Sequence, residues 1–176
     1  MRKIILYIAM SIDGYIADAS GKVDWLCGDG SDPEALGSYP EFYKNIDTII
    51  LGWKTYHQIV TELFLDKWVY KGKQSYVITH HPEEEKRDIH FYNGDVRKLA
   101  YELKQQDGKD IWICGGADIA QQLIKEDVID QYHLSIIPTI LGNGVPLFQE
   151  LEKEKKLRLI RTVNYNGIVD LVYERR

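Results

Sequence analysis

Residues 111–118 read Ile-Trp-Ile-Cys-Gly-Gly-Ala-Asp, and this stretch decides the class of fold. The apolar run 111–114 is typical of a strand that is covered on both faces. Two glycines end the run, and the apolar residues that follow recur with helical spacing at Ile119, Ala120, Leu123 and Ile124. The stretch therefore predicts a strand, a tight turn and a helix, which is the repeating unit of an α/β protein.

The same alternation runs along the whole chain. Strands are expected at 4–10, 48–51, 75–79, 90–92, 111–114 and 130–138, with helices between most of them, including 54–63. This order indicates a parallel sheet joined by right-handed crossovers. At the end of the chain, 157–164 and 168–174 flank Asn166-Gly167, a strong hairpin signal, so the sheet is expected to be mixed.

Two helix starts carry capping signals. Ser38, with Glu41 three residues later, has the pattern of a capping box. Asp95 can cap a helix whose apolar positions share one face, namely Val96, Leu99, Ala100 and Leu103. Each signal places a helix between two of the expected strands.

Length and charge limit the kinds of protein that this chain can be. It has 176 residues, 22 Lys and Arg against 27 Asp and Glu, and a formal charge of −5. We expect one domain over 1–176 that binds neither nucleic acid nor membrane, because the chain is acidic and no apolar run approaches the ~18 residues of a membrane span. Cys27 and Cys114, the two cysteines, lie far apart and favour a reduced, cytoplasmic protein.

Aromatic residues are abundant, at 11% of the chain. Tyr132, Phe148 and Trp112 are expected to fill the core. Trp25 and Trp53 instead lie in or beside loops that could receive a flat ligand.

Two strand-to-helix turns are candidates for binding phosphate. They are Gly52-Trp53-Lys54-Thr55 and Gly115-Gly116-Ala117-Asp118. Glycine lets another group approach the backbone, and the free N–H groups of a helix start attract anions. The alternative is that these glycines only permit tight turns.

A third feature lies at the end of the first expected strand. It is the stretch 10–17, Met-Ser-Ile-Asp-Gly-Tyr-Ile-Ala, followed by Ser20-Gly21 and Trp25. Ala9 is a small residue where flat rings could approach. The alternative is a simple β-turn at Asp13-Gly14.

Together these motifs resemble the dihydrofolate reductase superfamily. The likeness rests on four features in order, namely 11–17, 51–55, 113–116 and the closing hairpin, and it covers essentially the whole chain. It is closest to the branch that contains the reductase half of the bifunctional riboflavin-biosynthesis deaminase-reductase. The resemblance implies a three-layer α/β/α fold with a mixed, mostly parallel sheet, a bound NADPH and a homodimer. Ile136-Ile137 and Leu147-Phe148 would give the dimer its apolar surface.

The resemblance also implies a site. Residues bordering the cofactor would be Ala9, Ile16, Gly52, Trp53, Lys54, Thr55, Thr79, His80, Cys114, Gly115, Gly116, Ala117, Asp118, Ile119 and Gln122. Trp25, Tyr39 and Glu41 would lie near the substrate. Asp13 is the candidate catalytic group, contacting substrate or organising the proton path. The histidines lack the spacing of metal ligands, so no metal site is expected.

The chain departs from the family pattern at three points. Trp53 stands where the family usually has an arginine for the 2′-phosphate of NADPH, so NADH is not excluded. Tyr39 stands where dihydrofolate reductases carry a carboxylate on the first helix. A zinc-deaminase half is absent from the sequence. The expected activity is therefore hydride transfer from NAD(P)H to a small flat heterocycle, by analogy 5-amino-6-(5-phosphoribosylamino)uracil. The alternatives are a dihydrofolate reductase and a catalytically silent nucleotide-binding module.

Overall fold

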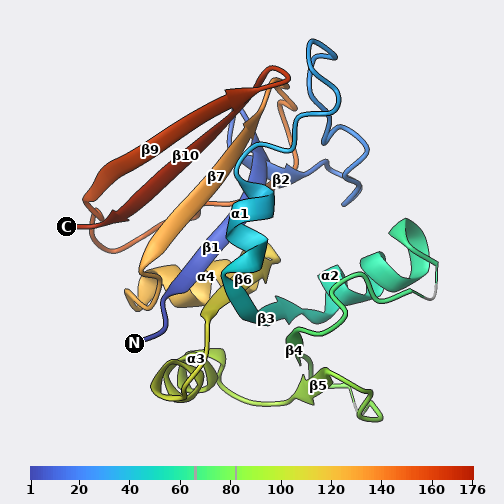
Figure 1. Ribbon diagram of the computed structural model, residues 1–176, viewed down its shortest axis with the longest axis vertical. Helices are drawn as coiled ribbons and strands as arrows, with labels where there is room; N and C mark the ends of the chain where they lie inside the picture. The colour runs from blue at the N-terminus through green and yellow to red at the C-terminus, as the bar shows by residue number, and fades with distance from the viewer. Residues whose placement is uncertain (66, 82) are drawn as a thin grey trace. The chain divides into compact units, whose positions relative to one another are not determined.

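The computed structural model describes residues 1–65, 67–81 and 83–176 and divides into two compact units (Figure 1). The first unit comprises Met1–Ile5 and Asn45–Ile129, and the second comprises Leu6–Lys44 and Asp130–Arg176. Within the described residues, no helix has both the length and the apolar character needed to cross a membrane.

The first unit contains a parallel sheet with strand order β5-β4-β3-β6. Its strands are β3 (Ile46–Gly52), β4 (Gln74–Ile78), β5 (Ile89–Tyr92) and β6 (Asp110–Gly115). Its helices are α2 (Trp53–Gln58), the π-helical turn η1 (Ile59–Leu63), α3 (Val96–Gln105) and α4 (Ala117–Lys125). Because β4 and β6 flank β3 on opposite sides, right-handed crossovers place α2 on one face and α3 on the other.

Helix α3 has the cap and the buried face that the sequence predicts. The Asp95 carboxylate accepts a hydrogen bond from the backbone N–H of Arg97. All four predicted apolar positions are buried, as are those of α4. In both helices the apolar spacing matches the turn of the helix, so one stripe faces the sheet.

The second unit is built mainly from long strands. These are β1 (Ile4–Ser11, which begins in the first unit), β7 (Gln131–Ile137), β9 (Leu157–Tyr165) and β10 (Ile168–Arg175), in the order β1-β7-β10-β9. The hairpin over Asn166-Gly167 is confirmed, with φ values of 46° and 74° that suit its tight turn. The predicted fold class, an α/β fold with a mixed, mostly parallel sheet, is therefore confirmed.

Two short strands and one cap differ from the sequence analysis. β2 (Tyr15–Ala17) pairs with β8 (Val145–Pro146), and both are too short to give a periodic signal. Helix α1 (Tyr39–Lys44) follows Ser38 as expected, but the predicted capping box is wrong. The Ser38 hydroxyl donates to Asp170, and Glu41 pairs with Arg161. In a capping box the glutamate carboxylate accepts from the serine backbone N–H, but the Ser38 N–H donates to the buried Asp170 carboxylate at 2.9 Å instead.

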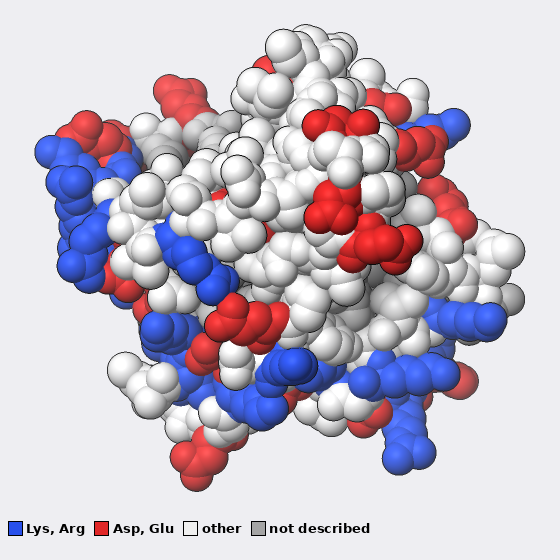
Figure 2. Space-filling model, turned by 45° about the horizontal axis from the view of Figure 1, so that its top comes forward, with Lys and Arg blue, Asp and Glu red and all other residues white. Residues whose placement is uncertain are grey.

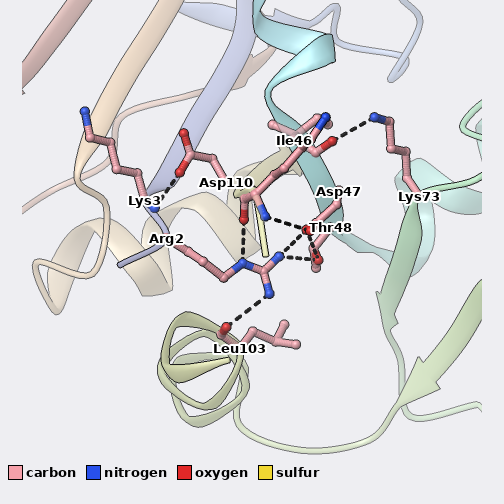
Figure 3. Close-up of polar contacts among 9 residues, drawn as sticks. Arg2, Lys3, Ile46, Asp47, Thr48, Lys73, Leu103 and Asp110 are labelled. Atoms are coloured by element: carbon pink, nitrogen blue, oxygen red, sulfur yellow. Dashed lines mark hydrogen bonds and ion pairs between the residues drawn. The ribbon is translucent and has the colours of Figure 1, made fainter. Parts of the chain in front are cut away.

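A buried arginine ties the beginning of the chain to the first unit (Figure 3). The Arg2 guanidinium forms an ion pair with Asp47 and donates to Thr48 Oγ1 at 2.5 Å and to the Leu103 carbonyl at 3.2 Å. Its Nε also donates to the Lys109 carbonyl at 2.5 Å. Arg2 is 5% exposed, so these acceptors replace the water that its charge would otherwise bind.

Candidate functional site

The two glycine turns lie side by side in the first unit. Strands β3 and β6 are parallel neighbours, and Leu51 pairs with Gly115 at the carboxyl ends of the two strands. A Cβ atom at Gly52 would lie 3.2 Å from Ile119 Cγ1 and 3.7 Å from the backbone nitrogen of Gly116. The turns therefore meet at one edge of the sheet, the edge at which open α/β sheets bind ligands.

The turn before α4 leaves helix-start amides without a side-chain cap. Gly116 is the N-cap residue, and it has no side chain that could accept from the first turn of α4. The peptide bond between Gly115 and Gly116 is cis. Lys54 is exposed on the neighbouring turn, and Asp118 is exposed in the first turn of α4. The amides and Lys54 can bind a phosphate group, whereas the Asp118 carboxylate opposes one close to it.

The end of β4 reaches the same edge. Gly52 pairs with Ile78, so Thr79 and His80 follow directly beside the first turn. Thr79 is buried, and its hydroxyl accepts a hydrogen bond from the backbone N–H of His81 at 3.0 Å. The exposed imidazole of His80 is hydrogen-bonded through Nδ1 to Asn93 Oδ1 at 2.8 Å. Thr79 is thus a positioning residue of this loop, and His80 lies at its surface.

Trp53 belongs to an aromatic cluster that the sequence analysis missed. Its ring centroid lies 5.3 Å from that of His81, 5.6 Å from that of Tyr56 and 6.4 Å from that of Phe91. In the sequence, the one signal of this aromatic cluster is that His81 directly follows His80, a residue assigned to the site. Such rings can stack against a flat base.

Cys114 lies at the end of β6 with its side chain turned toward Tyr70. The Tyr70 hydroxyl is 3.7 Å from the sulfur. Burial raises the pKa of the Cys114 thiol to about 12, so the group is neutral and contributes shape rather than charge. Among the other predicted cofactor residues, Ala117 and Ile119 are buried and Gln122 is exposed.

Asp13, the predicted catalytic group, anchors a loop of the second unit. Its carboxylate accepts from the Ser11 hydroxyl at 2.6 Å and from the backbone N–H groups of Gly142 at 2.7 Å and Leu141 at 3.1 Å. These hydrogen bonds, that of Ser11 above all, lower the pKa of Asp13. The group is therefore ionised at neutral pH, so it has no proton to donate, and the lowered pKa makes it a weak base.

The predicted substrate residues lie in different surroundings. Trp25 is half-buried in the long loop, and its indole N–H donates to the Lys22 carbonyl at 3.2 Å. Tyr39 packs edge-on against Tyr7, with ring centroids 5.7 Å apart. Glu41 is exposed, and its ion pair with Arg161 at 2.9 Å lowers the pKa of Glu41. Glu41 is therefore already neutralised by a protein cation.

Two residues bordering the expected nicotinamide position are half-buried on the first strands of the second unit. They are Ala9 on β1 and Ile16 on β2. Their roles, like those of the other predicted site residues, stay predictions. Across residues 1–65, 67–81 and 83–176, no group of three or more His, Cys, Asp or Glu side chains is placed to hold a metal ion.

Comparison with known proteins gives a consistent family. The family profile described as "RibD C-terminal domain" matches residues 2–169. The chain is 41% identical over 175 residues to the uncharacterized protein YwjB of Bacillus subtilis (strain 168), covering 99% of this chain and 98% of that one.

Solved structures support the same likeness. A putative riboflavin biosynthesis protein from Shewanella sp. PV-4 is 27% identical with a TM-score of 0.85, covering 99% of each chain. The deaminase/5-amino-6-(5-phosphoribosylamino)uracil reductase of Thermotoga maritima is 15% identical with a TM-score of 0.72, covering 99% of this chain and 57% of that one. Dihydrofolate reductase from Enterococcus faecalis, complexed with NADP(H) and RAB-propyl, is 18% identical with a TM-score of 0.69, covering 98% of this chain and 96% of that one. The last two likenesses concern the fold alone.

Proposed function

This chain belongs to the RibD C-terminal domain family, and from that membership we propose that it is an NAD(P)H-dependent reductase of a small, flat heterocycle. The analogous substrate is 5-amino-6-(5-phosphoribosylamino)uracil, which the Thermotoga maritima protein's description names. When bound, the nicotinamide would supply the hydride, and the protein would supply binding and orientation.

One observation carries the proposal. The turns at Gly52 and Gly116 meet so closely that a Cβ atom at either glycine would crowd its neighbour. Glycine at both positions lets the two helix starts approach each other, and the first turn of α4, whose N-cap residue has no side chain, would offer N–H donors to a pyrophosphate. Lys54 and the Thr55 hydroxyl would add a charge and a donor. These residues fit a dinucleotide.

The proposed cofactor preference is less strict than in a typical NADPH enzyme. Trp53, with His81 beside it, offers a ring surface for the adenine. It offers no guanidinium for a 2′-phosphate, so we propose that NADH serves as well as NADPH.

Two other functions follow from the same fold. A dihydrofolate reductase needs a carboxylate facing the pterin from the first helix, and α1 offers Glu41, which is paired with Arg161. A catalytically silent module would bind the nucleotide without oxidising it. The reductase is favoured because the family profile spans nearly the whole chain.

The test is a titration followed by an assay. NADPH and NADH are titrated while tryptophan fluorescence is recorded. The absorbance of the reduced nicotinamide is then followed with dihydrofolate and with 5-amino-6-(5-phosphoribosylamino)uracil. Oxidation with the uracil compound supports the proposal, and oxidation with dihydrofolate alone favours the alternative enzyme. Binding without any oxidation favours the silent module, and the absence of binding at millimolar nucleotide overturns all three.

We propose in addition that the protein is a homodimer, although two of the four residues first expected at its surface cannot contribute to it. Ile137 and Leu147 are buried, with 3% and 0% of their surfaces exposed. The exposed apolar residues of the second unit include Leu159 and Ile160 on β9, at 50% and 47%. β9 is the last strand in the order β1-β7-β10-β9 and therefore forms an edge, and such an edge can pair with a strand of another chain. Light scattering that gives the mass of one chain would overturn this proposal.

The charge pattern gives no reason to propose a nucleic-acid partner. On the face shown in Figure 2, Lys and Arg side chains lie beside Asp and Glu side chains over much of the surface. With a net charge of −5, this mixed pattern lacks the continuous basic field that a phosphate backbone requires.

A further inference from the structure

Three asparagines of this chain are directly followed by glycine, which makes each a candidate for spontaneous deamidation. They are Asn93, Asn143 and Asn166. In this reaction the backbone nitrogen of the following residue attacks the carbon of the side-chain amide, and glycine has no side chain to obstruct the attack. The local sequence therefore gives the three sites similar reactivity, and the tertiary structure decides which of them reacts first.

The Asn166 side chain is held by the loop that precedes α1. Its Oδ1 accepts from the backbone N–H of Gly30 at 2.9 Å and from that of Asp32 at 3.2 Å. A Cβ atom at Gly28 would lie 2.2 Å from Asn166 Nδ2, so backbone also packs against the amide. Turning this side chain toward Gly167 would break both hydrogen bonds, and the amide is therefore protected.

Asn93 is held by one partner in the first unit. Its Oδ1 is hydrogen-bonded to Nδ1 of the exposed His80 at 2.8 Å. A single hydrogen bond at the surface restrains a side chain by only about fivefold. We therefore expect Asn93 to be protected less than Asn166.

Asn143 differs because its side chain is turned toward the glycine that follows it. The backbone N–H of Gly144 donates to Asn143 Oδ1 at 2.8 Å, which places the attacking nitrogen beside the amide group. Among the residues that the structure describes, no other hydrogen bond holds this side chain. Asn143 is exposed in the loop between β7 and β8, so water reaches it. A group held next to its reaction partner reacts faster than one held away from it.

We propose that Asn143 is a site of spontaneous deamidation and that it reacts before the other two asparagines. The Gly144 nitrogen loses its proton to base and attacks Cγ of Asn143, and the Cγ–Nδ2 bond breaks to release ammonia. The product is a cyclic succinimide. Water then opens the ring at either carbonyl, which gives aspartate or an isoaspartate whose backbone runs through Cβ and Cγ. Water and base are the only other reactants, and the reaction is independent of the proposed reductase activity.

The modification would alter the loop that supports Asp13. The backbone N–H of Gly142, the residue before Asn143, donates to the Asp13 carboxylate at 2.7 Å. On the other side, a Cβ atom at Gly144 would lie 2.2 Å from the carbonyl oxygen of Ala17, so the two backbones are in contact. Isoaspartate lengthens the chain between positions 143 and 144 by an additional carbon atom, which would displace Gly144 from Ala17. We therefore expect the modified loop to lose its contacts with β2.

The test is incubation of the full chain at mildly alkaline pH, followed by peptide mass mapping. The conversion of each asparagine is measured by the mass increase from amide to acid. Asn143 is expected to convert at least about tenfold faster than Asn166, with Asn93 between them. The same incubation in concentrated guanidinium chloride is the control, because unfolding removes every contact and should bring the three rates together.

Two variants test the cause and the consequence. His80→Ala removes the partner of Asn93 and should speed the conversion of Asn93 by about fivefold, while the rate at Asn143 stays the same. Asn143→Ser keeps a short acceptor for the Gly144 N–H but has no amide to lose. After the same incubation, the wild-type protein should contain isoaspartate at position 143 and unfold at a lower temperature, whereas Asn143→Ser should keep its own unfolding temperature.

The proposal is overturned if Asn93 or Asn166 converts as fast as Asn143 in the folded protein. It is also overturned if Asn143 stays intact over a period that converts it in the unfolded chain. A preference for Asn143 that persists in guanidinium chloride would show that the folded structure is not its cause. An equal loss of unfolding temperature in Asn143→Ser would overturn the expected effect on the loop.

Discussion

In the first unit, Thr55 lies directly against the backbone of Gly116: a Cβ atom at Gly116 would be 3.3 Å from Thr55 Oγ1. The two residues are 61 positions apart in the sequence (116 − 55). Their approach joins the two turns that we assign to the phosphates of the cofactor.

Gly116→Ala is therefore expected to weaken NADPH binding by about tenfold or more, because the added methyl group occupies space beside the helix-start amides. The φ of Gly116 is −79°, which any residue adopts, so the change in stability comes only from the contact of the new methyl group with Thr55 Oγ1. Fluorescence titration measures the affinity, and thermal unfolding provides the control. A variant that binds NADPH as tightly as the wild type would contradict the placement of the phosphates.

Trp53→Arg is expected to raise the affinity for NADPH relative to NADH by about tenfold, because a guanidinium can pair with the 2′-phosphate that distinguishes the two nucleotides. Trp53→Phe is the matched control, since it keeps a ring beside His81 without adding a charge. Titration of both nucleotides against the three proteins gives the ratios. An unchanged ratio in Trp53→Arg would place the 2′-phosphate elsewhere.

Arg2→Met is expected to destabilise the protein by about 3 kcal/mol, the lower end of the range for breaking a buried ion pair, because Asp47 is partly exposed. The loss also leaves the Leu103 carbonyl and the Thr48 hydroxyl without their donor. Urea denaturation measures the free energy of unfolding. Arg97→Lys is the control, because Arg97 makes its ion pairs on the surface and should change stability little.

Acid should destabilise the N-terminus of α3 in a defined pH range. The hydrogen bonds and charge of Arg97 lower the pKa of Asp95 to about 2, from an ordinary value of 3.8. Because the pKa of Asp95 is lower in the folded state than in the unfolded state, its ionised carboxylate stabilises the folded protein at pH values above 3.8. This contribution to stability is lost as the pH falls from 3.8 toward 2. Asp95→Asn keeps a capping side chain but does not titrate. The unfolding temperature of the variant should therefore fall less between these pH values, and parallel curves would disprove the coupling.

Most predictions that depended only on residues close together in the sequence were confirmed. Asn166-Gly167 forms the expected hairpin turn, and Asp95 caps α3. Trp112 and Tyr132 are buried in the core as expected, at 5% and 2% exposure. Phe148 was wrongly assigned to the core and is 43% exposed, because its apolar character alone does not say which residue of a loop turns inward.

The predictions that failed involved partners far along the chain. The serine and glutamate of the supposed capping box bind Asp170 and Arg161, more than a hundred residues away. No local pattern marks Asp170, which lies in a hairpin strand among alternating residues. The two-residue strand β8 likewise exists only because β2 lies opposite it.

The amino-acid sequence by itself determined the order of strands and helices, the closing hairpin and the positions of the glycine turns, because periodicity, capping and turn chemistry act over a few residues. Only the tertiary structure decided that Gly52 and Gly116 meet, that Trp53 packs on His81, and that Ser38 gives its proton to Asp170. Those contacts depend on which strands become neighbours, and burial then forces each polar group to take the nearest partner that replaces water.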